Sequence, residues 1–158
     1  FRIILFRMTT AAFLLAVTVQ ASIVLHLVAP PAAAFSLFDP VNETRWDPQW
    51  KPVLLGSSVQ QGLVFLTADE RGRAVWLLDR YEPQVYSLRY VVTGEYILDQ
   101  IDISLRADGA DASVATVTYT RTSLESSADE RVRHFAQHFP LQAPHWEAAI
   151  NGALTRGR

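Results

Sequence analysis

The sequence is poor in several residue types, and each scarcity narrows the class of protein to consider. It contains no cysteine, which excludes disulfide bonds, thiolate zinc sites and cysteine nucleophiles. The formal net charge is only −2 and no basic run is present, so nothing indicates a nucleic-acid partner. Lys51 is the only lysine among 14 basic residues, a bias that we attribute to genome composition rather than to function.

The short motifs of common catalytic and nucleotide-binding sites are also missing. No G-x-S-x-G elbow, phosphate-binding glycine loop or dinucleotide fingerprint occurs. His134 and His138 have the i, i+4 spacing of a metal-binding pair, but the sequence offers no third ligand nearby and no HExxH motif. We therefore expect solvent-facing histidines, no metal site and no cofactor.

Length and composition indicate one globular domain. The chain has 158 residues, of which 49% are hydrophobic, and this is ample for a sizeable core. We expect that domain to span residues 17–156 and residues 1–16 to form an apolar N-terminal extension.

Residues 1–29 are strongly apolar and leave several alternatives open. They include the features of a signal peptide, are long enough to anchor the chain in a bilayer, and begin with residues that an upstream translation start would explain. Residues 17–28 argue against the first two, because odd positions are apolar and even positions are polar except Val24. This period of two predicts a strand, and Gln20 and His26 would be costly in lipid. We expect a cytoplasmic protein, with export or anchoring through residues 1–29 as the alternative.

The loop from Asp39 to Pro52 holds two tryptophans four positions apart, Trp46 and Trp50, with Glu43 and Arg45 before and beside the first. Tryptophan rings have a large apolar area to bury, so surface loops rarely carry two of them. The sequence therefore predicts that this loop packs onto the rest of the molecule as a lid or a corner.

Short β-like runs follow the loop, separated by turn residues at regular intervals. The strands predicted are 53–55, 63–67, 74–81, 85–93, 96–106 and 112–122. Regular turns between consecutive strands are typical of an antiparallel meander.

Helical periodicity occurs in two places. Pro31 opens a stretch of two short helices after the first strand, and Pro40 closes it. In the last third, Ser126 or Ser127 is expected to cap a helix that Pro140 interrupts, and Pro144 opens a second helix. Strands followed by a long C-terminal helical segment predict an α+β fold, a curved sheet wrapped around that helix. The apolar space between sheet and helix is a usual place for a ligand pocket.

A set of residues in order along the chain resembles a known superfamily. The residues are APPAAAFSLF at 29–38, then Pro40, Glu43, Arg45, Trp46, Trp50, Pro52, Val64, Phe65, Thr67, Trp76, Tyr90, YTRTSL at 119–124, Trp146 and Asn151. From about residue 22 to residue 153 the chain resembles the helix-grip superfamily of START, Bet v 1 and polyketide cyclase-like domains, the SRPBCC proteins, and most of all its bacterial branch of uncharacterised small members. The apolar N-terminal extension, Pro140 and Pro144 depart from that pattern.

The resemblance implies a pocket for a hydrophobic ligand between sheet and helix. It does not imply catalysis, because the superfamily includes carriers, cyclases and co-chaperone-like binders. The ligand-binding residues that we predict are Glu43, Arg45, Trp46, Trp50, Trp76, Arg89, Tyr90, Tyr119 and Trp146.

Several of these residues keep two interpretations. Glu43 and Arg45 either orient a ligand head group at the pocket mouth or form a local hydrogen bond that pins the loop. Trp46 and Trp50 either close over the cavity or cap the core. Asp99 is the weak candidate for a catalytic acid or base, because it shares the apolar face of its strand, unless a bulge exposes it.

Three hypotheses of function follow. The first is a binding module for a hydrophobic or amphipathic small molecule without turnover. The second is a polyketide cyclase or dehydrase-like enzyme that uses a buried acid such as Asp99 with a tyrosine or arginine. The third is a membrane-tethered or exported interaction domain, with membrane contact only through residues 1–29. The sequence does not determine the oligomeric state.

Overall fold

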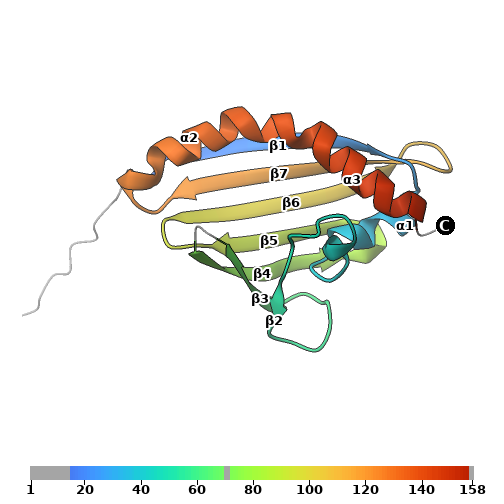
Figure 1. The fold of residues 1–158 in the computed structure, drawn as a ribbon, viewed down its shortest axis with the longest axis horizontal. Coiled ribbons are helices and arrows are strands. Elements are labelled where there is room, and N and C mark those ends of the chain that lie inside the picture. The colour runs from blue at the N-terminus through green and yellow to red at the C-terminus, as the bar shows by residue number, and fades with distance from the viewer. Residues whose placement is uncertain (1–14, 70–71, 157–158) are drawn as a thin grey trace, which may run out of the picture.

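Seven strands form one antiparallel sheet in the computed structural model, which describes residues 15–69 and 72–156 (Figure 1). The strands are β1 Thr18–Leu27, β2 Val53–Leu54, β3 Val64–Asp69, β4 Gly72–Glu82, β5 Ser87–Thr93, β6 Ile97–Ala107 and β7 Ser113–Ser123. Each predicted strand is present, with ends that differ by a few residues from the predicted ones.

The strand order is β1-β7-β6-β5-β4-β3-β2, so β2 to β7 are a meander in which chain neighbours are also sheet neighbours. Strand β1 pairs with β7 at the other end of the chain, where Thr18 lies opposite Thr122 and Leu27 lies opposite Ser113. The first and last strands are therefore adjacent, and β1 and β2 are the two edges.

The residues of β1 alternate between the two faces of the sheet. Ala21, Ile23, Leu25 and Leu27 are buried, and the even-numbered residues between them are exposed. This confirms the strand predicted from the period of two. Residues 1–14, most of the predicted N-terminal extension, lie outside the described residues.

Short helical elements follow β1. They are α1 Pro31–Ala34 and the 3₁₀ turns η1 Phe35–Phe38 and η2 Asn42–Arg45, and a further turn, η3 Pro83–Val85, precedes β5. Pro31 stands at the start of α1, where its missing N–H costs no hydrogen bond. The two short helices predicted after the first strand are thus present as α1 and the 3₁₀ turns.

A helical run at the C-terminus lies along β1 and β7 (Figure 1). It consists of η4 Ser126–Ala128, α2 Asp129–His138, η5 Phe139–Gln142 and α3 Ala143–Arg156. The 3₁₀ turn η5 falls where Pro140 was expected to interrupt the helix. Within residues 15–69 and 72–156, no helix has both the length and the apolar character needed to cross a bilayer.

The predicted serine cap of this run is wrong. Neither Ser126 nor Ser127 caps with its side chain, because helical geometry already begins at Ser126. The Ser123 hydroxyl instead donates to the Asp129 carboxylate at 2.5 Å. This bond ties the end of β7 to the first turn of α2.

Side chains of α3 complete the hydrogen bonds at one end of edge strand β1. The Glu147 carboxylate accepts from the His26 backbone N–H at 2.7 Å. The Asn151 carboxamide accepts from the Val28 N–H at 3.0 Å and donates to the His26 carbonyl at 2.9 Å. The helix therefore takes the place of a neighbouring strand here.

Candidate functional site

The loop Asp39–Pro52, called the tryptophan loop below, is fixed at its start by a buried carboxylate. Asp39 accepts from the backbone N–H groups of Val41 and Asn42 at 2.9 and 2.8 Å, and its second oxygen accepts from the Asn42 carboxamide. A carboxylate that satisfies the free N–H groups of a helical turn stabilises that turn. Asp39 thus holds η2 in place.

Both indole N–H groups of the tryptophan loop donate to carbonyls nine or ten residues earlier in the chain. Trp46 donates to the Leu37 carbonyl at 2.7 Å, and Trp50 donates to the Pro40 carbonyl at 2.8 Å. Trp46 is buried and Trp50 is half-buried. The loop therefore packs down over the sheet, as two tryptophans in one loop predict.

Beneath the tryptophan loop lies a small cavity of about 30 Å³, called the inner cavity below. Its lining residues are Phe38, Glu43, Trp46, Trp76, Tyr90, Ile101, Ile103, Val117, Tyr119 and Trp146. The volume holds about one water molecule. Aromatic rings therefore fill most of the wide apolar space expected between sheet and helix.

The polar atoms of these rings are mostly engaged elsewhere. Besides Trp46, Trp76 donates its indole N–H to the Thr67 hydroxyl at 2.9 Å, and the Tyr90 hydroxyl donates to the Phe38 carbonyl at 3.0 Å. Because these donors are already used, the rings offer the inner cavity mainly their π surfaces.

Glu43 is the carboxylate of the inner cavity. Among the described residues it has no hydrogen-bond or ion-pair partner for its side chain. Burial raises the pKa of Glu43 well above its ordinary value, and the nearby charges of Asp47 and Asp39 raise it further. A carboxyl group with a raised pKa and unbonded oxygens can donate a hydrogen bond when it is protonated and accept one when it is a carboxylate.

The two tyrosines of the inner cavity, Tyr90 and Tyr119, both have a raised pKa. Burial is the main cause of the raised pKa of both Tyr90 and Tyr119. Glu43 adds to the shift in each case, and Arg121 opposes it only at Tyr119. The surroundings of both tyrosine hydroxyls are thus mainly apolar, with Glu43 as a shared acidic neighbour.

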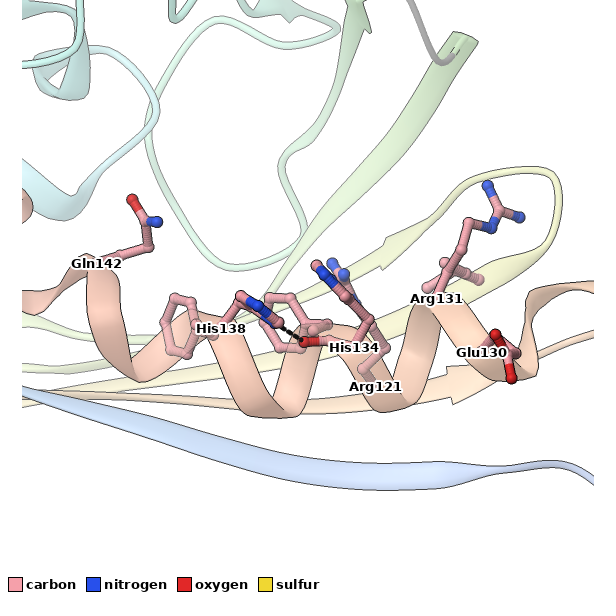
Figure 2. Close-up of a pocket in the computed structure, with 9 residues that line it drawn as sticks. Arg121, Glu130, Arg131, His134, His138 and Gln142 are labelled. Atoms are coloured by element: carbon pink, nitrogen blue, oxygen red, sulfur yellow. Dashed lines mark hydrogen bonds between the residues drawn. The ribbon is translucent and has the colours of Figure 1, made fainter.

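A larger opening of about 550 Å³, called the α2 groove below, lies beside α2 at the start of β6. Its lining residues are Ile97, Arg121, Glu130, Arg131, His134, Phe135, His138, Phe139 and Gln142. Arg131, His134, His138 and Gln142 project from the same side of the helical run (Figure 2). The groove joins an apolar part, Ile97 with the two phenylalanines, to a polar rim.

The two exposed histidines of the rim form a stack. Their ring centroids are 3.7 Å apart with an interplanar angle of 12°, and His138 Nδ1–H donates to the His134 carbonyl at 2.8 Å (Figure 2). This bond places the Nδ1 proton of His138 on the side of the helix backbone. Its Nε2 atom is therefore the one left for another partner.

Asp99 lies buried on the inner face of β6, on the side predicted from sequence. Both its oxygens accept from the Arg121 guanidinium at 2.7 Å, and that guanidinium lies 3.8 Å from the centre of the Phe135 ring. Asp99 is thus one half of an ion pair that links β6, β7 and α2. The carboxylate is buried as predicted from its place on the apolar face of its strand, and no bulge exposes it.

Phe139 separates the α2 groove from the inner cavity. It lines the groove, and its ring centroid is 4.7 Å from that of Tyr119 and 6.0 Å from that of Trp146, two residues of the inner cavity. Phe139 also begins the 3₁₀ turn between α2 and α3. One ring at the junction of two helices therefore stands between the two spaces.

Arg89 does not line either space, contrary to the prediction. Its Nε–H donates to Asp102 at 2.7 Å on the outer face of the sheet, while the next residue, Tyr90, points inward. Successive residues of a strand point to opposite faces, so Arg89 and Tyr90 cannot share a cavity.

Arg45 and Trp50 lie close to the inner cavity without lining it. Arg45 is exposed and forms no pair with Glu43, so the interpretation of a local Glu43–Arg45 hydrogen bond that pins the loop does not describe the arrangement. Trp50 packs edge-on against Trp76, with ring centroids 5.2 Å apart. Trp50 therefore packs against Trp76, a ring of the inner cavity, without lining that cavity itself.

Sequence analysis missed the residues of the α2 groove. Arg121 has the same parity as Tyr119 on β7, so strand alternation alone places both on the inner face. Phe135 and Phe139 stand four positions apart in the sequence, a spacing that indicates only an apolar stripe of a helix. Their part in a groove follows from the packing of α2 against the sheet, which the helical period does not specify.

The structure is similar to solved structures of low sequence identity. Ara h 8.0201 has 15% identity and a TM-score of 0.66, with 88% of this chain and 99% of that chain covered. A START superfamily protein from Mycobacterium smegmatis has 13% identity and a TM-score of 0.66, covering 88% and 99%. Norcoclaurine synthase from Thalictrum flavum, in complex with dopamine and hydroxybenzaldehyde, has 11% identity and a TM-score of 0.69, covering 97% and 98%. The sequence matches no family model and no curated protein.

The fold is therefore the helix-grip fold of Bet v 1 and START domains, as the SRPBCC resemblance predicted. At these identities the similarity defines the architecture alone. The function has to be argued from the residues of the site.

Proposed function

We propose that the protein binds an amphipathic small molecule whose apolar part lies in the α2 groove. The observation that carries this proposal is the groove itself, which sets Ile97, Phe135 and Phe139 beside a rim of charged and polar side chains. Ligand pockets typically combine an apolar lining with a few polar groups that orient the ligand.

The size of the groove favours this function. A volume of about 550 Å³ is within the range of small-molecule sites. The inner cavity, at about 30 Å³, is too small for a hydrophobic ligand as the rings now stand. One structure with this fold, norcoclaurine synthase, holds dopamine and hydroxybenzaldehyde, so the architecture accommodates small organic molecules.

The proposal is tested by filling the groove. Ile97→Trp places a large ring in the groove, and we expect it to weaken binding of the neutral fluorescent probe N-phenyl-1-naphthylamine by about tenfold or more. Leu98→Trp is the matched control, since Leu98 is the next residue of β6 and points to the outer face. Fluorescence titration of the wild type and both variants measures the affinities.

The proposal would be contradicted if both variants lost affinity equally, or if neither variant lost affinity. Equal loss would indicate a general effect on the fold, and unchanged affinity in Ile97→Trp would mean that the probe binds elsewhere. Thermal unfolding of each variant checks that the sheet is intact.

Of the other two hypotheses, neither gains an observation of its own. The cyclase-like enzyme would use a buried acid such as Asp99 with a tyrosine or arginine, and Asp99 is buried with both oxygens on Arg121 but lines neither space. The tethered or exported domain depends on the N-terminal segment, of which residues 1–14 lie outside the described part of the chain.

A further inference from the structure

We propose that the ligand is an amphipathic primary amine, and that its protonated amine enters the inner cavity beside Glu43 while its apolar body lies in the α2 groove. This inference rests on the proposed function and adds the chemical class of the ligand. Four features of the inner cavity support this class of ligand: its aromatic rings, its one carboxylate, the acidic residues near that carboxylate, and its volume.

The lining of the inner cavity suits a cation. Six of its ten lining residues are aromatic, one is Glu43, and none is lysine, arginine or histidine. The faces of aromatic rings attract ammonium groups through the ring quadrupole. An anionic head group would meet the same faces and a carboxylate, both of which repel it.

The hydrogen-bonding capacity of the inner cavity points the same way. The donors of Trp46, Trp76 and Tyr90 are bound to other atoms of the protein. The Glu43 carboxylate has no partner among the described residues, and neither has the Tyr119 hydroxyl. In the described part of the chain, the Trp146 indole N–H and the Tyr119 O–H are the donors of this lining without a hydrogen-bond partner, whereas the Glu43 carboxylate and the Tyr119 oxygen can accept from an ammonium group, which has three donors and no acceptor.

The charges around the inner cavity are not balanced from within it. Asp39 and Asp47 both raise the pKa of Glu43, and no cationic group counters them there. Arg121, whose charge lowers the pKa of Tyr119, is already paired with Asp99. A half-buried acid beside other carboxylates and without a cation favours its neutral form, and a bound ammonium would favour the carboxylate.

Size and position determine how the ligand is arranged. About 30 Å³ admits an ammonium group, which is close to a water molecule in size, but not a quaternary ammonium with its methyl groups. The rest of the ligand has to lie outside, and the α2 groove is separated from the inner cavity by the ring of Phe139. The proposed arrangement therefore requires the Phe139 ring to move aside when the ligand binds.

The test compares three ligands that share one tail, namely decylamine, decanol and decanoate, by titration calorimetry with the full chain. We expect decylamine to bind about tenfold tighter than decanol, and decanoate to bind weakest. In Glu43→Gln, decylamine should fall to the affinity of decanol while decanol stays the same. Glu125→Gln, which alters an exposed carboxylate away from both spaces, should keep the preference for the amine.

Glu130→Gln tests a simpler explanation, namely that the amine binds a carboxylate on the rim of the α2 groove. Glu130 lies on the rim of the α2 groove and also attracts an amine. A preference that disappears in Glu130→Gln and persists in Glu43→Gln would put the amine at the rim and overturn the inference. Equal binding of amine and alcohol overturns it while the proposed function stands, and binding of none of the three ligands overturns both.

A second measurement uses the wild type alone, in case Glu43→Gln does not fold. An ammonium beside Glu43 favours the carboxylate, so binding of decylamine at mildly acidic pH should release a proton from a group whose pKa is raised. Calorimetry in two buffers of different ionisation enthalpy detects that proton. Release with decylamine and none with decanol supports the inference, and no release with either contradicts it.

Discussion

Glu43 and Asp99 are two inward-facing acids with opposite surroundings. Asp99 has a guanidinium on both oxygens, whereas Glu43 faces a cavity of rings and has other carboxylates nearby. An ion pair satisfies a buried charge, and an unpaired acid in an apolar space favours its neutral form. Asp99 therefore links β6 to β7 as an ion pair, whereas the raised pKa of Glu43 makes it an acid whose charge we expect to change with pH.

Glu43→Gln tests this at the level of stability. The folded protein binds a proton on Glu43 more tightly than the unfolded chain does. The stability that Glu43 contributes is therefore complete below its ordinary pKa and is lost as pH rises through the raised pKa. We expect the wild type to lose stability from acidic towards neutral pH, and Glu43→Gln to flatten that part of the profile and to be the more stable form at neutral pH.

Urea unfolding across that pH range measures the effect. Groups that face Glu43, namely Asp39, Asp47, Tyr90 and Tyr119, remain in both proteins, so the difference between the two profiles belongs to Glu43. Parallel profiles would mean that Glu43 is ionised and solvated in the folded state.

For single residues, the sequence predicted which side chains line a cavity better than it predicted the size of that cavity. Trp46, Trp76, Tyr90, Tyr119 and Trp146 were all expected around a cavity, and all line one. Its small volume follows from how the rings pack against one another, for example Trp46 with Trp146 at 5.4 Å. Ring packing depends on distances between strands and helix, which no local pattern encodes.

Among the elements, α3 has two functions at once. One side of the helix packs Ile150, Ala153 and Leu154 into the core, and another side presents Glu147 and Asn151 to the edge of β1. A strand edge with unpaired N–H and C=O groups is prone to pair with other chains. Side chains from α3 satisfy part of that edge.

Hydrogen exchange distinguishes the two side chains. We expect Glu147→Ala to speed exchange of the His26 amide by about fivefold, the effect of losing about 1 kcal/mol of hydrogen bonding, and to leave the Val28 amide nearly as protected. Asn151→Ala should do the reverse. Each variant is the control for the other, and equal changes at both amides in both variants would indicate a general loosening of α3.

The elements themselves were predictable because their signals are local. Alternation and turn residues marked all seven strands, and Pro140 marked the interruption of the helical run. The side of the sheet that α2 covers was not predictable from its stripe. Its position depends on long-range packing, including the stacking of Arg121 on Phe135.

In the whole molecule, most strands of the sheet pair with strands that are close in sequence, and one pair joins strands that are far apart in sequence. Strands β2 to β7 pair with chain neighbours, but β1 pairs with β7 across separations such as the 96 residues between Ser22 and Thr118. Closing so long a loop costs entropy before any contact forms. We expect β1 to join the sheet late in folding.

Two equal truncations test the order of assembly. Ile23→Val in β1 and Ile103→Val in β6 each remove one methylene from a buried side chain, at a cost of about 1 kcal/mol. Ile23→Val should mainly speed unfolding, and Ile103→Val should mainly slow folding. Stopped-flow measurements over a range of urea concentrations give both rates, and a larger effect of Ile23→Val on folding would reverse the proposed order.

The tryptophans gather at one end of the interior. Trp46 and Trp76 line the inner cavity, Trp146 contacts Trp46, and Trp50 contacts Trp76. With only 4 tryptophans in the chain, its intrinsic ultraviolet emission comes from this cluster alone, and excitation passes readily among rings so close together. A molecule that stays in the α2 groove should therefore leave the emission spectrum nearly unchanged, whereas one that reaches Glu43 should alter both its wavelength and its intensity.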